Sequence, residues 1–483
     1  MLKKLGKDAV IYGGADFIFK AIAFATLPVY VRLFSVADFG LMSLLSVTAG
    51  LVGMLVNMGV SSAVQRFYWD PATTPENQPV IVSTGLVQLA GIGFMTLALA
   101  AVSIHAVGQV IYERYGIEWK LAMLAVCTVL PDQIVQFVQD TLRLHFTPLR
   151  FIILSFSKNL LGVALGLWLI IGLKEGLYGF FAGSLLASIA TVPLALWFIG
   201  KDLTLRFDRQ ISREIFSYGT PFVFAGLAYW VFGSMDRWML AELGNAREVG
   251  LYSVAFKIAT IVTFVTAAFS QAWSPHVIKM VRDDPDYRKT FSRVFSLWYF
   301  LLAVIGLLIS LFSREILMLL TPQDYWGAAS VLAAVAMGLV LLGTTQITAL
   351  GISIEKKTSL LTHGAWLTAC VNLGLNYVLI PSFGAQGSAW ATLLSYALLN
   401  AFFLYWGQKL HPVPLETRKL LYCTFLVAVA LLSPALFSEN SWNPIMAITL
   451  KLIFLSALIG GAFAMDIIDR QLLGRFSGKI MPP

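Results

Sequence analysis

Five cationic side chains lie inside long apolar stretches of the sequence, where a charge is unfavourable. They are Lys20, Lys158, Arg237, Lys257 and Lys451. A cation near the middle of a bilayer costs about 2.5–3.5 kcal/mol on insertion scales, so it normally faces a partner or an aqueous cavity. Lys451 lies near the outer end of its stretch, where we expect its long side chain to reach the lipid headgroups. The other four are expected to line a cavity that binds an anion, such as a phosphate or pyrophosphate.

These four cations are expected at different membrane depths, two in each half of the chain. At a rise of 1.5 Å per residue, Lys20 lies near the midplane of its helix and Lys158 in the inner half of another. Lys257 lies in the outer half of a third helix, and Arg237 lies near the outer end of a fourth. Two arginines at the cytoplasmic ends of neighbouring helices extend this path, namely Arg66 and Arg143.

Structural pairing is the alternative for each of these cations. Asp16 and Lys20 are four residues apart on one helix face, so the two charges can neutralise each other. Arg237 can pair with an acid on a neighbouring helix, whereas the adjacent Asp236 is expected to point elsewhere. We favour the substrate cavity, and both interpretations remain open at this stage.

Acidic residues inside the apolar stretches are the candidates for ion coupling. Asp132 follows Pro131 in the middle of a helix, where it can carry a coupling proton or form a stabilising hydrogen bond. Asp16 is the second coupling candidate. The three cysteines lie far apart, the five histidines are scattered, and no catalytic constellation or metal-ligand spacing occurs. We therefore expect no catalytic residue, no metal and no cofactor, with a proton or sodium ion as the possible driving ion.

The elements that carry these residues must be membrane helices. Apolar residues make up 58 % of the chain and charged residues 12 %, against about a quarter charged in soluble domains. The mean hydropathy is +0.78. The sequence predicts an all-α polytopic membrane protein with about fourteen spans. They are expected at 9–31, 39–64, 80–104, 121–142, 151–173, 177–199, 215–240, 249–275, 294–312, 327–352, 359–381, 386–408, 419–437 and 446–465.

Basic residues are distributed unevenly between the two sets of helix ends. With the N-terminus in the cytoplasm, most Lys and Arg outside the spans fall on the cytoplasmic side, as the positive-inside rule requires. The opposite side holds only Arg32, Arg114, Lys120, Lys174, Arg247 and Arg314. We expect both termini in the cytoplasm, and we attribute the net charge of +8 to topology rather than to nucleic-acid binding.

Two pairs of segments indicate an internal repeat. VADFGLMSLL at 36–45 is similar to AREVGLYSVA at 246–255, and EGLYGFFAGSLLAS at 175–188 is similar to FGAQGSAWATLLSY at 383–396. The repeat predicts two parallel six-helix lobes related by an axis along the membrane normal. We expect the lobes at 1–200 and 215–408, a cytoplasmic linker at 201–214, and an extra helix pair with a cytoplasmic tail at 409–483.

Several segments resemble the polysaccharide transporter family. They are LPVYVRLFSVADFGLMSLL, VGLYSVAFKIA, AFSQAWSPHV and, most specifically, NLGLNYVLIPSFGAQGSAWATLLSY at 372–396. The family contains Wzx-type flippases of lipid-linked oligosaccharides, within the superfamily of MATE exporters and the lipid II flippase MurJ. The resemblance implies two six-helix lobes around a central cavity, and helices 13–14 resemble an extra pair that some members carry.

The resemblance also implies a function. A flippase of this kind moves an undecaprenyl-pyrophosphate-linked O-antigen or exopolysaccharide unit across a bacterial inner membrane by alternating access. Its expected partners are the lipid-linked oligosaccharide, membrane lipids and polysaccharide assembly proteins. A MATE-like antiporter of cationic drugs is an alternative, although its cavity should be acidic. A MurJ-like lipid II flippase is the closest alternative. A membrane enzyme is disfavoured, because no loop is long enough to hold a catalytic domain.

Overall fold

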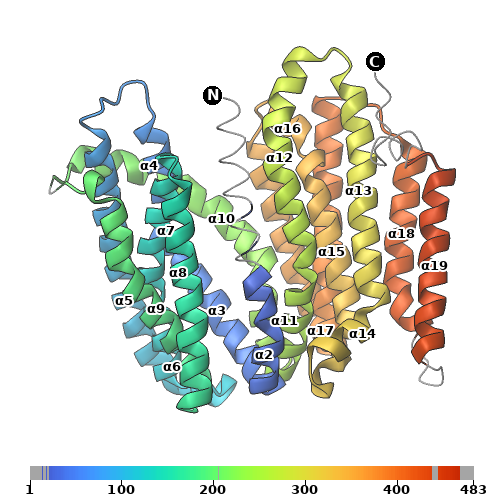
Figure 1. Cartoon of the computed structure of the whole chain (residues 1–483), viewed down its shortest axis with the longest axis horizontal. Helices are drawn as coiled ribbons and strands as arrows, with labels where there is room; N and C mark the ends of the chain where they lie inside the picture. Colours follow the sequence, from blue (N-terminus) through green and yellow to red (C-terminus); the bar gives the residue numbers. More distant parts are fainter. Residues whose placement is uncertain (1–13, 15–17, 19–20, 205, 438–443, 468–483) are drawn as a thin grey trace. The chain divides into compact units, whose positions relative to one another are not determined.

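The computed structural model describes residues 14, 18, 21–204, 206–437 and 444–467, and all regular elements in these ranges are helices. Contacts divide the chain into two compact units, Met1–Gly250 and Leu251–Pro483. The helices of the first unit are α2 (Leu27–Leu33), α3 (Val36–Asn57), α4 (Val60–Tyr68), α5 (Gln78–Tyr115), α6 (Trp119–Cys127), α7 (Val129–Leu144), α8 (Pro148–Leu167), the π-helix η1 (Trp168–Gly172), α9 (Gly176–Phe198), the 3₁₀ turn η2 (Gly200–Asp202) and α10 (Arg209–Leu243) (Figure 1).

The remaining helices follow α10 in chain order, and α11 crosses the boundary between the two units. They are α11 (Ala246–Ala259), α12 (Ile261–Asp283), α13 (Tyr287–Leu311), α14 (Ser313–Leu320), the 3₁₀ helix η3 (Gln323–Ala328), α15 (Ala329–Thr348), α16 (Leu350–Ile354), α17 (Ser359–Leu410), α18 (Thr417–Leu436) and α19 (Pro444–Ala464).

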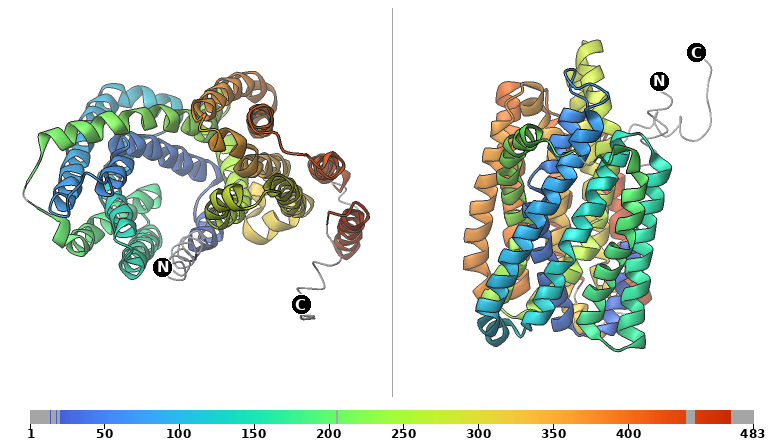
Figure 2. Two further views of the ribbon diagram at one scale, coloured as in Figure 1. Left: turned by 90° about the horizontal axis from the view of Figure 1, so that it is seen from above. Right: turned by 90° about the vertical axis from the view of Figure 1, so that its left-hand side faces the viewer.

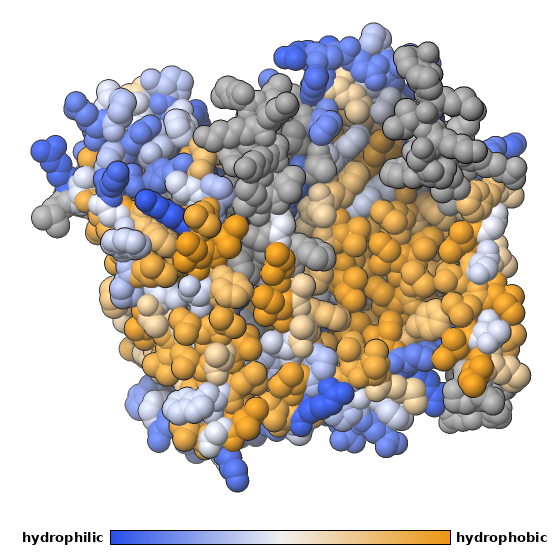
Figure 3. All heavy atoms as spheres, in the orientation of Figure 1, coloured by the Kyte–Doolittle hydropathy of each residue, from blue (hydrophilic) through white to orange (hydrophobic). Residues whose placement is uncertain are grey.

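The helices have the length and composition of membrane spans. Twelve helical segments of the described residues are long and apolar enough to cross a bilayer. At 52 residues, α17 would be about 78 Å long if straight, far more than one crossing needs. It is broken at Gly384, so it contains the two spans expected at 359–381 and 386–408. Figure 3 shows apolar side chains over the middle of the visible face and hydrophilic ones at both ends. The protein is therefore a multi-pass α-helical membrane protein.

The count of fourteen spans stays a prediction. The first expected span, 9–31, falls partly on residues outside the described ranges, and the structure describes a short apolar helical stretch at Ala21–Leu33. The cytoplasmic tail expected after the last span lies almost wholly outside these ranges as well.

Helix starts follow from local sequence. Ser35 caps α3 by accepting a hydrogen bond from the backbone N–H of Asp38, and its own hydroxyl donates to the Asp38 carboxylate. Asp208 caps α10 by accepting from the N–H groups of Gln210 and Ile211. Such caps satisfy amide groups that lack a partner at a helix start. They fix where the chain enters each helix.

Helix α7 lies at the centre of the first unit. It packs against α3, α4, α5, α8 and α9. Its apolar side chains Val135, Phe137, Val138 and Leu142 are fully buried in the core of the unit. Because neighbours surround α7, its polar residues cannot all face lipid. This arrangement positions the candidate site described below.

Helix α10 belongs by contact to the first unit. It packs against α3, α4 and α5, and Arg114 forms an ion pair with Glu242. Upstream of α10, the hydroxyl of Ser83 donates to the Asp202 carbonyl and accepts from the Thr204 N–H, which ties the connection to α5. The repeat instead assigns α10 to the second lobe by chain order. Lobe boundaries at 200 and 215 therefore stay a prediction.

The second unit is built on α15. This helix packs against α13, α17 and α18, and most of its side chains are buried. Helices α18 and α19 lie side by side at one edge of the unit (Figure 2), where Tyr422 of α18 donates a hydrogen bond to the Leu458 carbonyl of α19. The extra pair is thus attached to the second unit.

The ammonium group of Lys451 does not extend to the lipid headgroups, contrary to the prediction from the sequence. Its side chain is 5 % exposed and its ammonium lies 2.6 Å from a carboxylate oxygen of Glu315 in α14. The rings of Phe312 and Phe437 lie 5.6 and 5.8 Å from the ammonium. The expectation of snorkelling is wrong, because a nearby acid and two aromatic faces offer the charge a closer partner than the interface.

The internal repeat is visible in backbone geometry. Gly176 and Gly384, which align in the repeat, have φ values of 52° and 53°. Three residues later, Gly179 and Gly387 each lie against the backbone of the helix that precedes them. A left-handed residue followed by a close approach favours glycine at both positions. The two copies therefore share this pair of glycine positions at a helix-to-helix corner in each unit.

The first pair of repeat segments meets within the first unit. A Cβ atom at Gly40 would lie 2.2 Å from the Ala246 carbonyl oxygen, and one at Gly250 would lie 1.9 Å from that of Val36. The starts of α3 and α11 thus touch backbone to backbone, which only glycine permits.

We predict that Gly387→Ala destabilises the protein, because the new methyl group would lie 2.4 Å from the Leu379 carbonyl oxygen. The expected cost is about 1–3 kcal/mol, or several degrees of unfolding temperature in detergent. Gly374→Ala, in the same helix with nothing within 4 Å, is the matched control and should be neutral or slightly stabilising. Equal unfolding temperatures for both variants would contradict the close contact.

Candidate functional site

The polar face of α7 carries the first part of the candidate site. Asp132, Gln136, Asp140 and Arg143 recur at spacings of three or four residues, which places them on one side of the helix. Asp132, Gln136 and Asp140 are half-buried, and Arg143 is exposed. Polar side chains at membrane depth normally face the bundle interior or a water-filled space. This face of α7 therefore points away from lipid.

The structure brings two of the predicted site residues together. Lys158 of α8 forms an ion pair with Asp132 of α7, and the hydroxyl of Ser188 in α9 lies 3.5 Å from the same carboxylate. The Lys158 side chain is 20 % exposed and that of Asp132 39 %. The pair is thus neither fully buried nor fully solvated. The cation expected to hold substrate and the acid expected to carry a proton neutralise each other here.

Three amide side chains of α3 and α7, none of them predicted from the sequence as site residues, form further polar contacts in this unit. Asn57 of α3 donates to Ser61 at 3.1 Å and to the carbonyl oxygen of Gln133 at 3.4 Å. The Gln133 side chain packs against Gly53, where a side chain would not fit. A Cβ atom at Gly53 would lie 2.9 Å from the amide nitrogen of Gln133. Gln136 donates to Asp140 at 3.3 Å. For Gln133 and Gln136, only their spacing from the acids of α7 could have revealed them, because an amide carries no charge signal.

The two arginines expected at the cytoplasmic mouths each pair with an acid three or four residues away in the chain. Arg143 lies 3.4 Å from Asp140 and stands over the ring of Phe151, 4.6 Å from its centre. Arg66 lies 3.1 Å from Asp70. Their side chains remain 46 % and 53 % exposed. Both can therefore still meet an anionic ligand.

Arg237 is paired with a residue that was expected to point elsewhere. Its Nη1 donates to the Asp236 carboxylate at 2.8 Å and to the Gly233 carbonyl at 2.6 Å. Both side chains are almost fully buried. The expectation for Asp236 is wrong, because the long arginine side chain folds back along α10 and reaches its neighbour. This geometry agrees with the structural alternative for Arg237.

Lys257 differs from the other cations. Its side chain is exposed on α11, while Tyr252, Val254, Ala255 and Ile258 on the packed side of the helix are buried. Among the described residues, no acid lies within ion-pair distance of Lys257. The two remaining predicted residues, Lys20 and Asp16, lie outside the described residues.

A buried polar network joins the two halves of α17 to α11. Asn372 donates to Ser395 at 3.2 Å, Asn376 donates to the Asn372 side chain at 3.0 Å, and the hydroxyls of Tyr252 and Thr392 are 3.0 Å apart. All five residues are fully buried. Paired polar groups in a membrane bundle hold helices together. The two asparagines, which carry the family resemblance, thus serve the kink region of α17.

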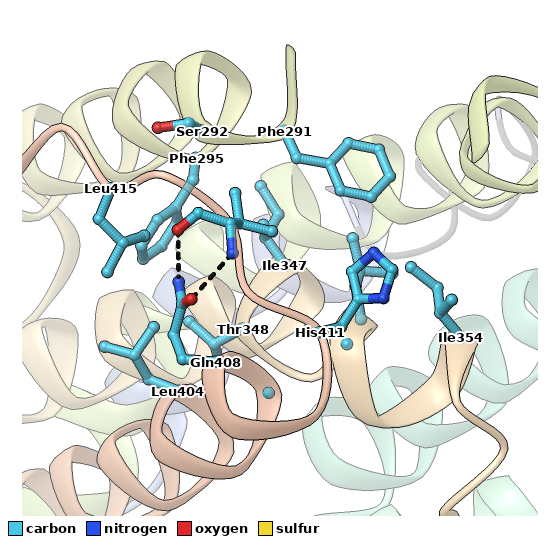
Figure 4. Close-up of a pocket in the computed structure, with 14 residues that line it drawn as sticks. Phe291, Ser292, Phe295, Ile347, Thr348, Ile354, Leu404, Gln408, His411 and Leu415 are labelled. Carbon is cyan, nitrogen blue, oxygen red and sulfur yellow. Dashed lines mark hydrogen bonds between the residues drawn. The ribbon is translucent and has the colours of Figure 1, made fainter. Parts of the chain in front are cut away.

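A cavity in the second unit is too small for a glycan. It measures about 40 Å³ and is lined by Phe291, Phe295 and Leu404, among others (Figure 4). Beside it, Gln408 exchanges two hydrogen bonds with the backbone of Val413. His411 lies 2.7 Å from the Tyr287 hydroxyl and 2.9 Å from Glu355. These contacts fasten the ends of α13, α16 and α17.

No metal centre is evident in the described part of the chain, where three or more His, Cys, Asp or Glu side chains nowhere gather as ligands. The arrangement offers ion pairs, amides and an exposed cation, Lys257, that has no acid within ion-pair distance among the described residues. These groups can bind and release a polar ligand, and they do not form a nucleophile–base pair.

Known proteins resemble this chain in sequence. The model of a family described as polysaccharide biosynthesis protein matches residues 29–330, more than half of the chain. An uncharacterised membrane protein of Methanocaldococcus jannaschii is 22 % identical over 273 residues, covering 54 % of this chain and 53 % of that protein. The probable low-salt glycan biosynthesis flippase Agl15 of Haloferax volcanii is 24 % identical over 221 residues, covering 44 % and 46 %. The chain spans about half the length of these curated relatives.

Solved structures share the fold. The lipid II flippase MurJ in an inward closed conformation has a TM-score of 0.75 at 14 % identity, covering 95 % of this chain and 99 % of that one. An inward-facing MATE family multidrug transporter has a TM-score of 0.59 at 15 % identity, covering 83 % and 94 %. At these identities the likeness shows the fold alone. With the family model matching more than half of its length, this chain belongs to the polysaccharide biosynthesis protein family.

Proposed function

We propose that the protein is a flippase for an undecaprenyl-pyrophosphate-linked oligosaccharide, an O-antigen or exopolysaccharide repeat unit. It works by alternating access in a bacterial inner membrane, with both termini in the cytoplasm, and it is a transporter rather than an enzyme. Lys257 is the observation that carries the proposal. An exposed cation in a membrane helix, with no acid beside it among the described residues, is stabilised by an anionic ligand.

The other cations have distinct roles in this proposal. Arg66 and Arg143 attract the anionic headgroup at the cytoplasmic end, since both side chains remain about half exposed. Lys158 is held by Asp132 until protonation of the acid releases it. Lys20 and Asp16 complete the path, and Arg237 supports it from its buried pair with Asp236.

Two other cargoes deserve comparison. Lipid II is also a sugar on a polyprenyl pyrophosphate, and the fold likeness to MurJ extends over nearly the whole chain. A cationic drug, as carried by MATE exporters, fits less well because Lys257 and Lys158 would repel it. Our proposal couples transport to a proton rather than to sodium, because binding of a proton to the Asp132 carboxylate would break its ion pair with Lys158.

The cargo can be identified directly. Loss of the protein should cause one lipid-linked glycan to accumulate on the cytoplasmic leaflet, measured by leaflet-specific labelling and mass spectrometry. We expect an undecaprenyl-pyrophosphate oligosaccharide. Accumulation of lipid II would instead assign the MurJ-type function, and no accumulation of any lipid-linked glycan would refute a flippase.

We predict that Lys257→Met reduces glycan translocation about tenfold or more, which corresponds to losing at least about 1.4 kcal/mol of interaction with the anion. The amount of protein in the membrane should not change. Lys257→Arg should retain part of the activity because it keeps the charge. Lys279→Met, which removes an exposed lysine from the same unit, is the control. Normal glycan export by Lys257→Met would rule out this residue as the anion site.

The Lys158–Asp132 pair offers a second test. Asp132→Asn should leave insertion intact but make translocation independent of the proton gradient, measured in vesicles with and without an imposed pH difference. If the pair is only structural, each single neutral variant should lower protein levels, and Asp132→Asn with Lys158→Met should restore them. Recovery of both protein level and gradient-driven transport in that double variant would argue against coupling through Asp132.

A further inference from the structure

The end of the first unit opposite Arg66 and Arg143 contains a second cavity. It measures about 470 Å³, within the range of small-molecule sites. It is bounded by the end of α2, the start of α3, the turn between α5 and α6, and the turn between η1 and α9. These turns lie at the bottom of the first unit in Figure 1. None of the functions proposed above uses this cavity.

Polar groups from three of these segments converge on the cavity. The Tyr178 hydroxyl donates to Glu118 at 2.7 Å, and the Ser35 hydroxyl donates to Asp38 at 2.7 Å. Each carboxylate has further lone pairs with which to accept hydrogen bonds. Lys174 is exposed at the rim and supplies a donor. The capping of α3 explains Asp38, but it explains neither Glu118 nor Lys174.

The turn that carries Lys174 is strained. It follows the π-helix η1, and Lys174 has a φ of 58°, a left-handed conformation that is costly for a residue with a side chain. Short π-helical turns and such outliers often mark functional sites. The bond from the Glu175 N–H to the Leu169 carbonyl at 3.1 Å fixes the turn.

The matching corner of the second unit does not repeat this chemistry. It has a glycine of positive φ at Gly384, but Ser382 and Gln386 stand where the first unit has Lys174 and Tyr178, and the positive φ of Lys174 has no counterpart at Ser382. The corner shared by the two copies therefore does not account for the lysine and the tyrosine. Their side chains are therefore available for a ligand.

The chemistry of the lining identifies the class of ligand. Two carboxylates and one ammonium give a net negative charge, which disfavours a pyrophosphate. Acceptors and a donor around an apolar floor, which includes Phe34 and Leu121, suit a sugar ring with its hydroxyl edge and its C–H face. We propose that this cavity binds a saccharide of the cargo on the outer side of the membrane. The assignment rests on the flippase function and orientation proposed above.

The binding test uses the free oligosaccharide, released by mild acid from the lipid-linked glycan that accumulates when the protein is lost. Purified full-length protein should bind this oligosaccharide in a calorimetric titration. Glu118→Ala should raise the dissociation constant about tenfold, and Tyr178→Phe should raise it about fivefold. Glu113→Ala is the matched control, because Glu113 is also exposed and accepts a hydrogen bond from Gln109 at 3.1 Å. Inorganic pyrophosphate should not displace the oligosaccharide.

The outcomes separate this inference from the flippase proposal. No binding by the wild type, or equal binding by wild type and Glu118→Ala, would overturn the saccharide cavity even when the lipid-linked glycan still accumulates in cells that lack the protein. Absence of that accumulation would overturn the flippase function itself. In that case a commercial set of neutral hexose oligosaccharides serves as the probe, and loss of binding in Glu118→Ala would still support a saccharide site.

Discussion

The cost of an unpaired charge in lipid is the constraint on which this structure depends. Each intramembrane cation that the structure describes has either an acid partner or an exposed position. Lys451 meets Glu315, Arg237 meets Asp236, and Lys158 meets Asp132. The pairs of Lys451 and Lys158 each join two helices, and the pair of Arg237 lies within one helix. The cost of a charge in lipid therefore also helps to fix how the helices pack.

The pairs differ in how much freedom they leave. Arg237 and Lys451 are almost fully buried, so the separation of either pair would leave a charge without compensation. The pair of Lys158 and Asp132 is partly exposed, so water or a ligand can replace either partner. Lys257 has no acid nearby among the described residues. Some cations are thus held in buried pairs, and others can exchange their partner for a ligand. Such a set of cations suits a protein that must bind an anion and then release it.

Glycine has a complementary role in this fold. Gly176 and Gly384 turn the chain in each copy of the repeat, and Gly40 and Gly250 let two helices touch. Sequence similarity between the copies was visible because these positions tolerate no side chain. The surrounding positions, such as Lys174 and Ser382, were free to diverge, and they distinguish the two units chemically.

The sequence by itself determined the membrane-spanning helices, the repeat and the set of unusual intramembrane charges, because hydropathy and glycine constraints act locally along the chain. It did not determine the partners. Asp236 was expected to point away from Arg237, Lys451 was expected at the headgroups, and Gln133 was not selected. Only the tertiary structure decides such contacts, because an ion pair depends on which helix lies within a few ångströms, and that distance has no signature in the order of residues.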